Sequence, residues 1–86
     1  MLTTKLETMI TKKMETEELL IVGVEYKCSN IMGNTLIYNY DFEDGIYIEG
    51  DNMTISIPSD QECIIEYNEL EEEFVIKNNE TIFYLS

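Results

Sequence analysis

The chain has 86 residues, 44% of them apolar, and its 18 acidic residues against five lysines give a formal net charge of −13. A chain of this length forms one domain with a thin core. It contains no arginine, histidine or tryptophan. Histidine catalysis and histidine metal ligation are therefore excluded, and binding of phosphates by lysine and arginine side chains is not expected.

The N-terminal segment has the pattern of an amphipathic helix, which we place at about residues 4–17. Thr4 followed by Glu7 fits a capping box, in which each side chain satisfies a free backbone N–H at the helix start. Glutamates at the far end oppose the helix dipole, so the helix should end at residues 16–18. Four apolar residues form a stripe at the helical period: Leu6, Met9, Ile10 and Met14.

From residue 19 onward the spacing of short apolar runs and turn residues is typical of antiparallel β structure. Around residues 35–42 apolar and polar residues alternate, which predicts a half-buried strand with Tyr38 and Tyr40 packed on its apolar face. A three-residue loop at 43–45 keeps one face of the following hairpin apolar, because it sets Tyr40 opposite Ile48. Gly45 then occupies the position that needs a left-handed residue.

Two further hairpins complete the predicted sheet. Gly50-Asp51 as a type II′ turn would place Ile48 opposite Met53, and Pro58 would end that strand. A strand at about 63–67 follows.

The last hairpin, with a loop at residues 78–80, would set Ile76 opposite Ile82 and Phe74 opposite Tyr84. The sequence therefore predicts one α+β domain over residues 1–86. Its N-terminal helix packs on an antiparallel sheet of about six strands, and a partly rolled barrel stays open as the alternative.

The longest apolar run, residues 19–24, is far shorter than the ~18–20 residues that span a bilayer. The apolar residues at the N-terminus are interrupted by Lys, Glu and Thr, so no signal peptide is predicted. Cys28 and Cys63 match no metal or redox motif. We expect a cytoplasmic protein whose cysteines are free, small buried side chains, and a disulfide between them stays open.

Catalytic machinery is missing from the sequence. No serine lies in a nucleophile elbow, neither cysteine has a base beside it, and the glycines are explained by turns. A calcium loop with Gly45 at its sixth position would need ligands at Tyr40 and Phe42, which are aromatic. We predict no enzyme, no cofactor and no metal.

The acidic residues are concentrated in one half of the chain. Residues 1–40 hold five acids and four lysines, whereas residues 41–86 hold thirteen acids and one lysine. Alternate residues on a strand lie ~6.6 Å apart, so acids at that spacing form a regular line of charge. A charge run is usually a solvated face, but a net charge of ~2–8 already serves solubility in a small domain. The excess indicates a basic partner.

We therefore take two acidic groups and one tyrosine as candidate partner-binding residues. Tyrosine is enriched in interfaces, and Tyr47 should face outward, with Tyr26 or Tyr67 as further candidates. The predicted set is Asp41, Glu43, Asp44, Tyr47, Glu49, Asp51, Glu66, Glu69, Glu71, Glu72 and Glu73.

In size, acidity, missing catalytic residues and helix-plus-sheet pattern, the chain resembles the small acidic inhibitors encoded by phages and mobile elements, which include DNA mimics and many anti-CRISPR proteins. The resemblance implies a blocker of the nucleic-acid site of a basic protein such as a CRISPR effector, acting in the host cytoplasm without binding nucleic acid or membrane itself. An immunity protein or antitoxin against a basic toxin such as a nuclease is the first alternative. A structural module that acts through a strand edge or as a homodimer is the second.

Overall fold

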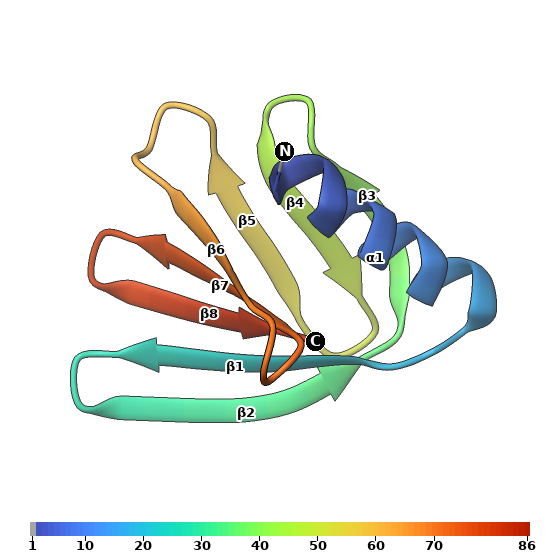
Figure 1. The fold of residues 1–86 in the computed structure, drawn as a ribbon, viewed down its shortest axis with the longest axis horizontal. Coiled ribbons are helices and arrows are strands. Elements are labelled where there is room, and N and C mark those ends of the chain that lie inside the picture. Colours follow the sequence, from blue (N-terminus) through green and yellow to red (C-terminus); the bar gives the residue numbers. More distant parts are fainter. Residues whose placement is uncertain (1) are drawn as a thin grey trace.

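A computed structural model describes residues 2–86 as one helix and two antiparallel sheets (Figure 1). The five-stranded sheet has the order β2-β1-β8-β7-β6, and the three-stranded sheet has the order β3-β4-β5. The predicted α+β class is confirmed, but the sheets do not close into a barrel. The elements are α1 (Leu2–Thr16), β1 (Leu20–Tyr26), β2 (Ser29–Thr35), β3 (Ile37–Asp41), β4 (Gly45–Gly50), β5 (Thr54–Pro58), β6 (Ile64–Asn68), β7 (Glu73–Asn78) and β8 (Thr81–Leu85).

Helix α1 bridges the two sheets, because it packs on β3 of one and β6 of the other. The predicted stripe is confirmed: Leu6 and Ile10 are fully buried, and Met9 and Met14 pack beside them. On the β3 side, the hydroxyl of Thr11 donates a 2.6 Å hydrogen bond to the hydroxyl of Tyr40. On the β6 side, the Lys5 ammonium lies 3.7 Å from the centroid of the Tyr67 ring.

The two ends of α1 differ in how well the sequence predicts them. The predicted capping box at Thr4 is wrong, because the helix already runs from Leu2 and Thr4 lies inside it. There the Thr4 carbonyl accepts a hydrogen bond from the Thr8 hydroxyl at 2.9 Å. The predicted stop is confirmed. Glu17 turns to a φ of 57°, and the N–H of Glu18 donates to the carbonyl of Lys13 at 2.9 Å, as in a Schellman motif.

The core lies between the two sheets under the helix. On β1, β4, β5 and β7 alternate residues point inward, which is the two-residue period of a half-buried sheet. The buried apolar side chains are Leu6, Ile10, Leu20, Val22, Ile37, Ile46, Ile48, Ile55, Ile57, Phe74, Ile76 and Leu85.

The predicted strand at 35–42 is divided between the two sheets. The chain leaves β2 at Thr35 and enters β3 at Ile37, and the β3–β4 register shifts between Ile37 and Asn39. That irregularity turns Ile37 inward, with 6% of its surface exposed, and leaves Tyr38 65% exposed. Packing of Tyr38 on the apolar face was therefore a wrong prediction, whereas Tyr40 does pack against the core.

The β3–β4 hairpin has the predicted register. Tyr40 faces Ile48 and Asp41 faces Tyr47. Gly45 has a φ of 108°, and a side chain there would place its Cβ 2.8 Å from the nitrogen of Ser59. Glycine is required at this position both for its backbone conformation and for the close approach of β5.

The β4–β5 hairpin has a longer loop than predicted. Ile48 faces Ile55 rather than Met53, and Gly50 has no positive φ, so the type II′ turn is not formed. The reason is a tertiary contact. Asp51 Oδ1 accepts a 2.9 Å hydrogen bond from the hydroxyl of Thr35, which fastens the loop to the corner between β2 and β3.

The β7–β8 hairpin is one residue out of the predicted register. Its loop contains two residues, because Asn78 pairs directly with Thr81 and Asn79 takes a φ of 56°. Phe74 therefore faces Leu85, which is fully buried, and the predicted pair of Phe74 with Tyr84 is wrong. Asparagine tolerates the left-handed conformation that a short loop requires.

Candidate functional site

The outer face of the three-stranded sheet carries candidate residues in two cross-strand rows. Tyr47 on β4 lies between Asp41 on β3 and Ser56 on β5. In the next row Glu49 lies between Asn39 and Thr54. Strands in a sheet are ~4.8 Å apart, so the tyrosine ring has a carboxylate in its own row and another two residues along its strand. We call Asp41, Tyr47 and Glu49 the acidic face.

The environment of Tyr47 is unfavourable for ionisation. Partial burial raises the pKa of its phenol, and the neighbouring Glu49 raises it further through its charge and a side-chain hydrogen bond. Tyr47 therefore stays a neutral phenol at physiological pH. It can provide an apolar ring surface and a polar tip beside two carboxylates, the combination that makes tyrosine frequent in interfaces.

The predicted regular line of carboxylates along the strands is not formed. Strand β3 ends at Asp41, and Glu43 lies in the following turn, where its N–H donates to Asp41 Oδ1 at 2.9 Å. Asp51 also lies in a turn, and its Oδ1 accepts from the Leu36 N–H at 2.9 Å as well as from Thr35. These hydrogen bonds hold the pKa of Asp51 below its ordinary value of 3.8, the backbone bond contributing most.

Two connections at one end of the molecule instead carry four acidic residues. Gly45 pairs with Pro58, so the β3–β4 turn lies beside the connection between β5 and β6, and both are at the top of Figure 1. We call this group the acidic end: Glu43, Asp44, Asp60 and Glu62. The last two were missing from the predicted set, since only the pairing of β4 with β5 brings them near the first two.

The second predicted group lies mostly in the β6–β7 turn. Asn68 Oδ1 shapes this turn by accepting from the N–H groups of Leu70 at 3.1 Å and Glu71 at 3.3 Å. Leu70 is 96% exposed, an apolar side chain that the sequence interpretation missed. The sequence feature that could have indicated it is a leucine within a run of glutamates. Glu69, Glu71 and Glu72 are exposed around it, and Glu73 begins β7.

The two acidic groups do not lie together. Strand β6 runs from the connection at the acidic end to the β6–β7 turn, so these glutamates are at its opposite end (Figure 1). A single partner that contacted both groups would have to extend along the length of β6.

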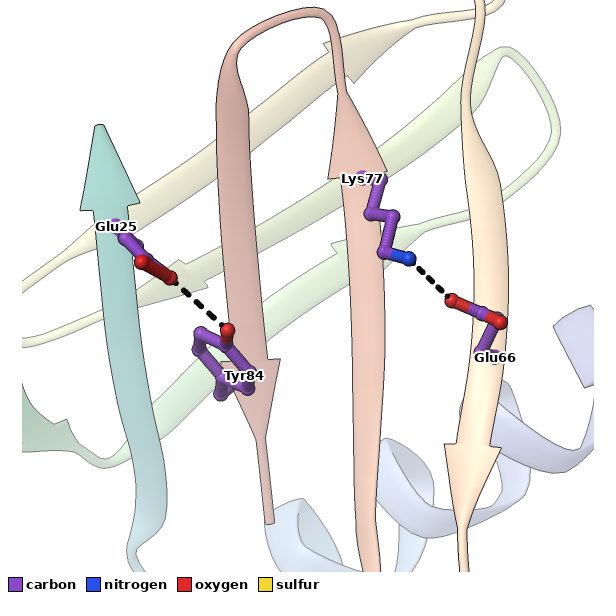
Figure 2. A network of polar contacts seen from close by, with 4 residues as sticks. All are labelled: Glu25, Glu66, Lys77 and Tyr84. Carbon is purple, nitrogen blue, oxygen red and sulfur yellow. Dashed lines mark hydrogen bonds and ion pairs between the residues drawn. The ribbon is translucent and has the colours of Figure 1, made fainter. Parts of the chain in front are cut away.

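Glu66 lies on the outer face of the five-stranded sheet and already forms an ion pair with a lysine side chain. Figure 2 shows it paired with Lys77 at 2.9 Å, with Tyr84 nearby donating a 3.0 Å hydrogen bond to Glu25. The hydrogen bond to Glu66 raises the pKa of Lys77, and the bond to Glu25 raises that of Tyr84. The Lys77–Glu66 pair is exposed on the surface, where an ion pair adds little to stability.

The lysines lie outside the strands and connections of the three-stranded sheet, three of them on α1. Between Lys27 and Lys77 the chain contains twelve acids and no basic residue. Lys13 donates to the Leu19 carbonyl at 3.2 Å, and Lys27 lies 3.8 Å from Glu80. The acidic face and the acidic end are therefore built from a segment that contains no cation.

The remaining tyrosine and cysteine predictions have mixed outcomes. Tyr26 is exposed, whereas Tyr67 packs on Phe74 with 4.8 Å between ring centroids. Both cysteines are free, so the open disulfide is not formed. Cys28 is exposed in the β1–β2 turn, against the prediction that it is buried. Cys63 is half-buried, and burial raises the pKa of its thiol, which disfavours the thiolate.

Among residues 2–86, no group of three or more cysteine or acidic side chains is placed to hold a metal ion. A search of the same residues finds no helix with the length and apolar character needed to cross a membrane. Comparisons with family models, curated proteins and solved structures find no match for this chain.

Proposed function

We propose that this chain is a small acidic inhibitor without enzymatic activity that binds a basic nucleic-acid-binding protein, such as a CRISPR effector, and blocks its nucleic-acid site. The observation that carries the proposal is the segregation of charge. The three-stranded sheet and its connections, residues 37–62, contain seven acids and no lysine. A surface of one sign attracts a partner of the other sign, and nucleic-acid sites are lined with lysine and arginine.

Binding would begin with long-range attraction and end with direct pairing. At physiological salt the attraction extends over ~8 Å, so it speeds the encounter and weakens as salt rises. The acidic end then pairs with Lys or Arg side chains of the partner that otherwise hold phosphates. Tyr47 adds a ring between the carboxylates of Asp41 and Glu49, and it serves as the apolar anchor at the centre of the contact.

The β6–β7 turn offers a separate contact. Leu70 is 96% exposed and has glutamates on both sides, which suits a small apolar pocket with a basic rim. Asp51 and Glu66 are weaker candidates for binding the partner, because contacts within the chain already engage their carboxylates. The chain would act in the cytoplasm of a host cell, where such effectors work.

Competition tests the proposal directly. A purified RNA-guided nuclease is titrated with the chain at low salt, once with its nucleic-acid channel empty and once with guide and target bound. We expect binding to the empty channel, weaker binding to the filled one, and loss of target cleavage at one chain per nuclease. Equal binding to both forms would contradict mimicry. Binding to a toxin nuclease and to no guided nuclease would instead favour the immunity-protein alternative.

Charge reversal locates the surface. Glu43→Lys with Asp44→Lys should weaken binding at least about tenfold, or ~1.4 kcal/mol, because it replaces attraction with repulsion at the acidic end. The matched control is Glu15→Lys with Glu17→Lys, which changes the net charge equally at the exposed end of α1. Affinities measured by calorimetry that fall equally in both variants would show that total charge, and not this surface, governs binding.

A further inference from the structure

Strand β2 is an edge strand without the usual protection. It is the last strand of the five-stranded sheet, so one side of its backbone has no neighbouring strand in that sheet. Natural edges are commonly protected by lysine, proline or a bulge, because an open edge pairs with other strands. Residues 28–40 contain no charged residue and no proline, although 27% of the whole chain is charged. Ile31 and Met32 are 60% and 74% exposed.

The hydrogen-bonding pattern identifies the free backbone groups of this edge. Ile21 on β1 and Ser86 exchange hydrogen bonds of 2.8 and 3.0 Å, so Ile21 directs its N–H and carbonyl away from β2. Directions alternate along a strand, and Val22 and Val24 therefore bond to their β2 partners, Gly33 and Ile31. The residues between and beside those partners direct their backbone groups outward: Asn30, Met32 and Asn34.

The sequence of this edge is close to palindromic. An antiparallel copy centred on Met32 sets Asn30 opposite Asn34 of the copy. The flanking positions match too, since Ser29 meets Thr35 and Ile31 meets Gly33, which leaves room for the larger side chain. In this register Asn30, Met32 and Asn34 thus meet residues of their own kind, and both chains use one patch, as in other two-fold interfaces.

We infer that β2 pairs antiparallel with β2 of a second copy of this chain, joining the two five-stranded sheets into one. The outward groups of Asn30, Met32 and Asn34 would form about six hydrogen bonds across the axis. The Asn34 carbonyl already accepts from the Asn52 amide at 3.1 Å, and its second lone pair is available for the new bond.

Charge is compatible with self-association at this site. Two copies carry a net charge of −13 each and repel, so the contact must lie where the chain is neutral. The β2 edge fulfils this condition. Added salt screens the repulsion and should therefore strengthen the dimer. A complex with a basic partner has the opposite salt dependence, so this inference and the proposed function can fail separately.

The test measures the sedimentation of the full chain up to roughly millimolar concentration, at low and high salt. We expect a monomer–dimer equilibrium that salt shifts toward the dimer. Met32→Glu should raise the dissociation constant at least about tenfold, because it sets two carboxylates opposite each other. Ile64→Glu is the control: it adds the same charge at an exposed position on β6, the other end strand of that sheet.

Amide hydrogen exchange gives a readout specific to the strand pairing. The N–H groups of Asn30 and Met32 should exchange rapidly in dilute solution and become protected as concentration rises. A chain that remains monomeric in high salt would overturn the inference. So would a dimer that Met32→Glu leaves unchanged, or one in which these two amides stay unprotected.

Discussion

At the residue scale, Asp51 shows how a candidate binding residue can have a structural role. Its Oδ1 accepts from the Thr35 hydroxyl and the Leu36 N–H, both at 2.9 Å. Thr35 is buried, and its hydroxyl also accepts from the N–H of Asn52 at 3.1 Å. A Cβ on Gly50 would lie 2.8 Å from the Leu36 carbonyl oxygen, so glycine allows this close approach. Together these contacts fasten the β4–β5 turn to the corner between the sheets.

Asp51→Asn should lower stability at neutral pH, because the charged acceptor is lost. The folded-state pKa of Asp51 lies below its ordinary value of 3.8, so its contribution is present above that value and disappears as the pH falls through the folded-state pKa. Chemical unfolding of wild type and variant between pH 7 and pH 2 measures the difference. It should be constant down to about pH 4–5 and vanish below the folded-state pKa.

Asp44→Asn provides the comparison for that experiment. Asp44 is exposed in the β3–β4 turn, and this substitution removes the same charge. It breaks none of the hydrogen bonds at the corner, so at pH 7 it should destabilise the protein less than Asp51→Asn does. If Asp51→Asn behaves like Asp44→Asn, the hydrogen bonds at the corner do not stabilise the fold.

The sequence could not predict this role for Asp51. Its position after Glu49 in an alternating pattern indicated an outward side chain, and its partner Thr35 is sixteen residues away. Asp41 and Tyr47 were placed correctly on one face, because a local hairpin register is enough to pair them.

At the scale of elements, the end of α1 has a conformation that its sequence does not favour. Glu17 has a φ of 57°, a left-handed conformation in which a side chain is strained and glycine is not. Glu17→Gly should therefore stabilise the protein by about 0.5–1 kcal/mol. Urea unfolding of this variant and of Glu17→Ala, which removes the charge but keeps the Cβ, separates the two effects. A gain in Glu17→Ala equal to that in Glu17→Gly would assign the effect to charge.

The three hairpin predictions show which part of a sheet depends on local sequence. The β3–β4 register followed from Gly45 and the apolar alternation. In the β4–β5 hairpin the error was two residues, so Ile48 and Ile55 still face the core. In β7–β8 the error was one residue, which moves Tyr84 to the outer face. A register error of two residues leaves the same side chains facing the core, whereas an error of one residue turns them to the other face.

At the scale of the whole molecule, the acidic half of the sequence forms separate groups rather than one surface. The acidic end and the glutamates of the β6–β7 turn lie at opposite ends of β6. The net charge and its concentration along the chain were evident from composition. Their arrangement in space was not, because it depends on how β5 and β6 are connected across the two sheets.

Repulsion among these carboxylates should make stability depend on salt. Raising sodium chloride from about 50 to 500 mM shortens the Debye length by roughly threefold, and the melting temperature should rise by several degrees. Glu71→Lys with Glu72→Lys should melt higher at low salt and respond less, because two negative charges are removed and two positive charges are added. A wild-type melting temperature that stays flat or falls would indicate that the carboxylates are already compensated.

The absence of basic residues between Lys27 and Lys77 has a practical consequence for anyone handling the protein. Trypsin has no cleavage position in that stretch, so a digest reports on α1, the β1–β2 turn and β7 but leaves the three-stranded sheet as part of one long peptide. Amine-reactive dyes and cross-linkers attach outside it as well. Immobilisation through lysines would thus leave the carboxylate-bearing sheet unmodified and facing the solution, whereas carbodiimide coupling would consume it.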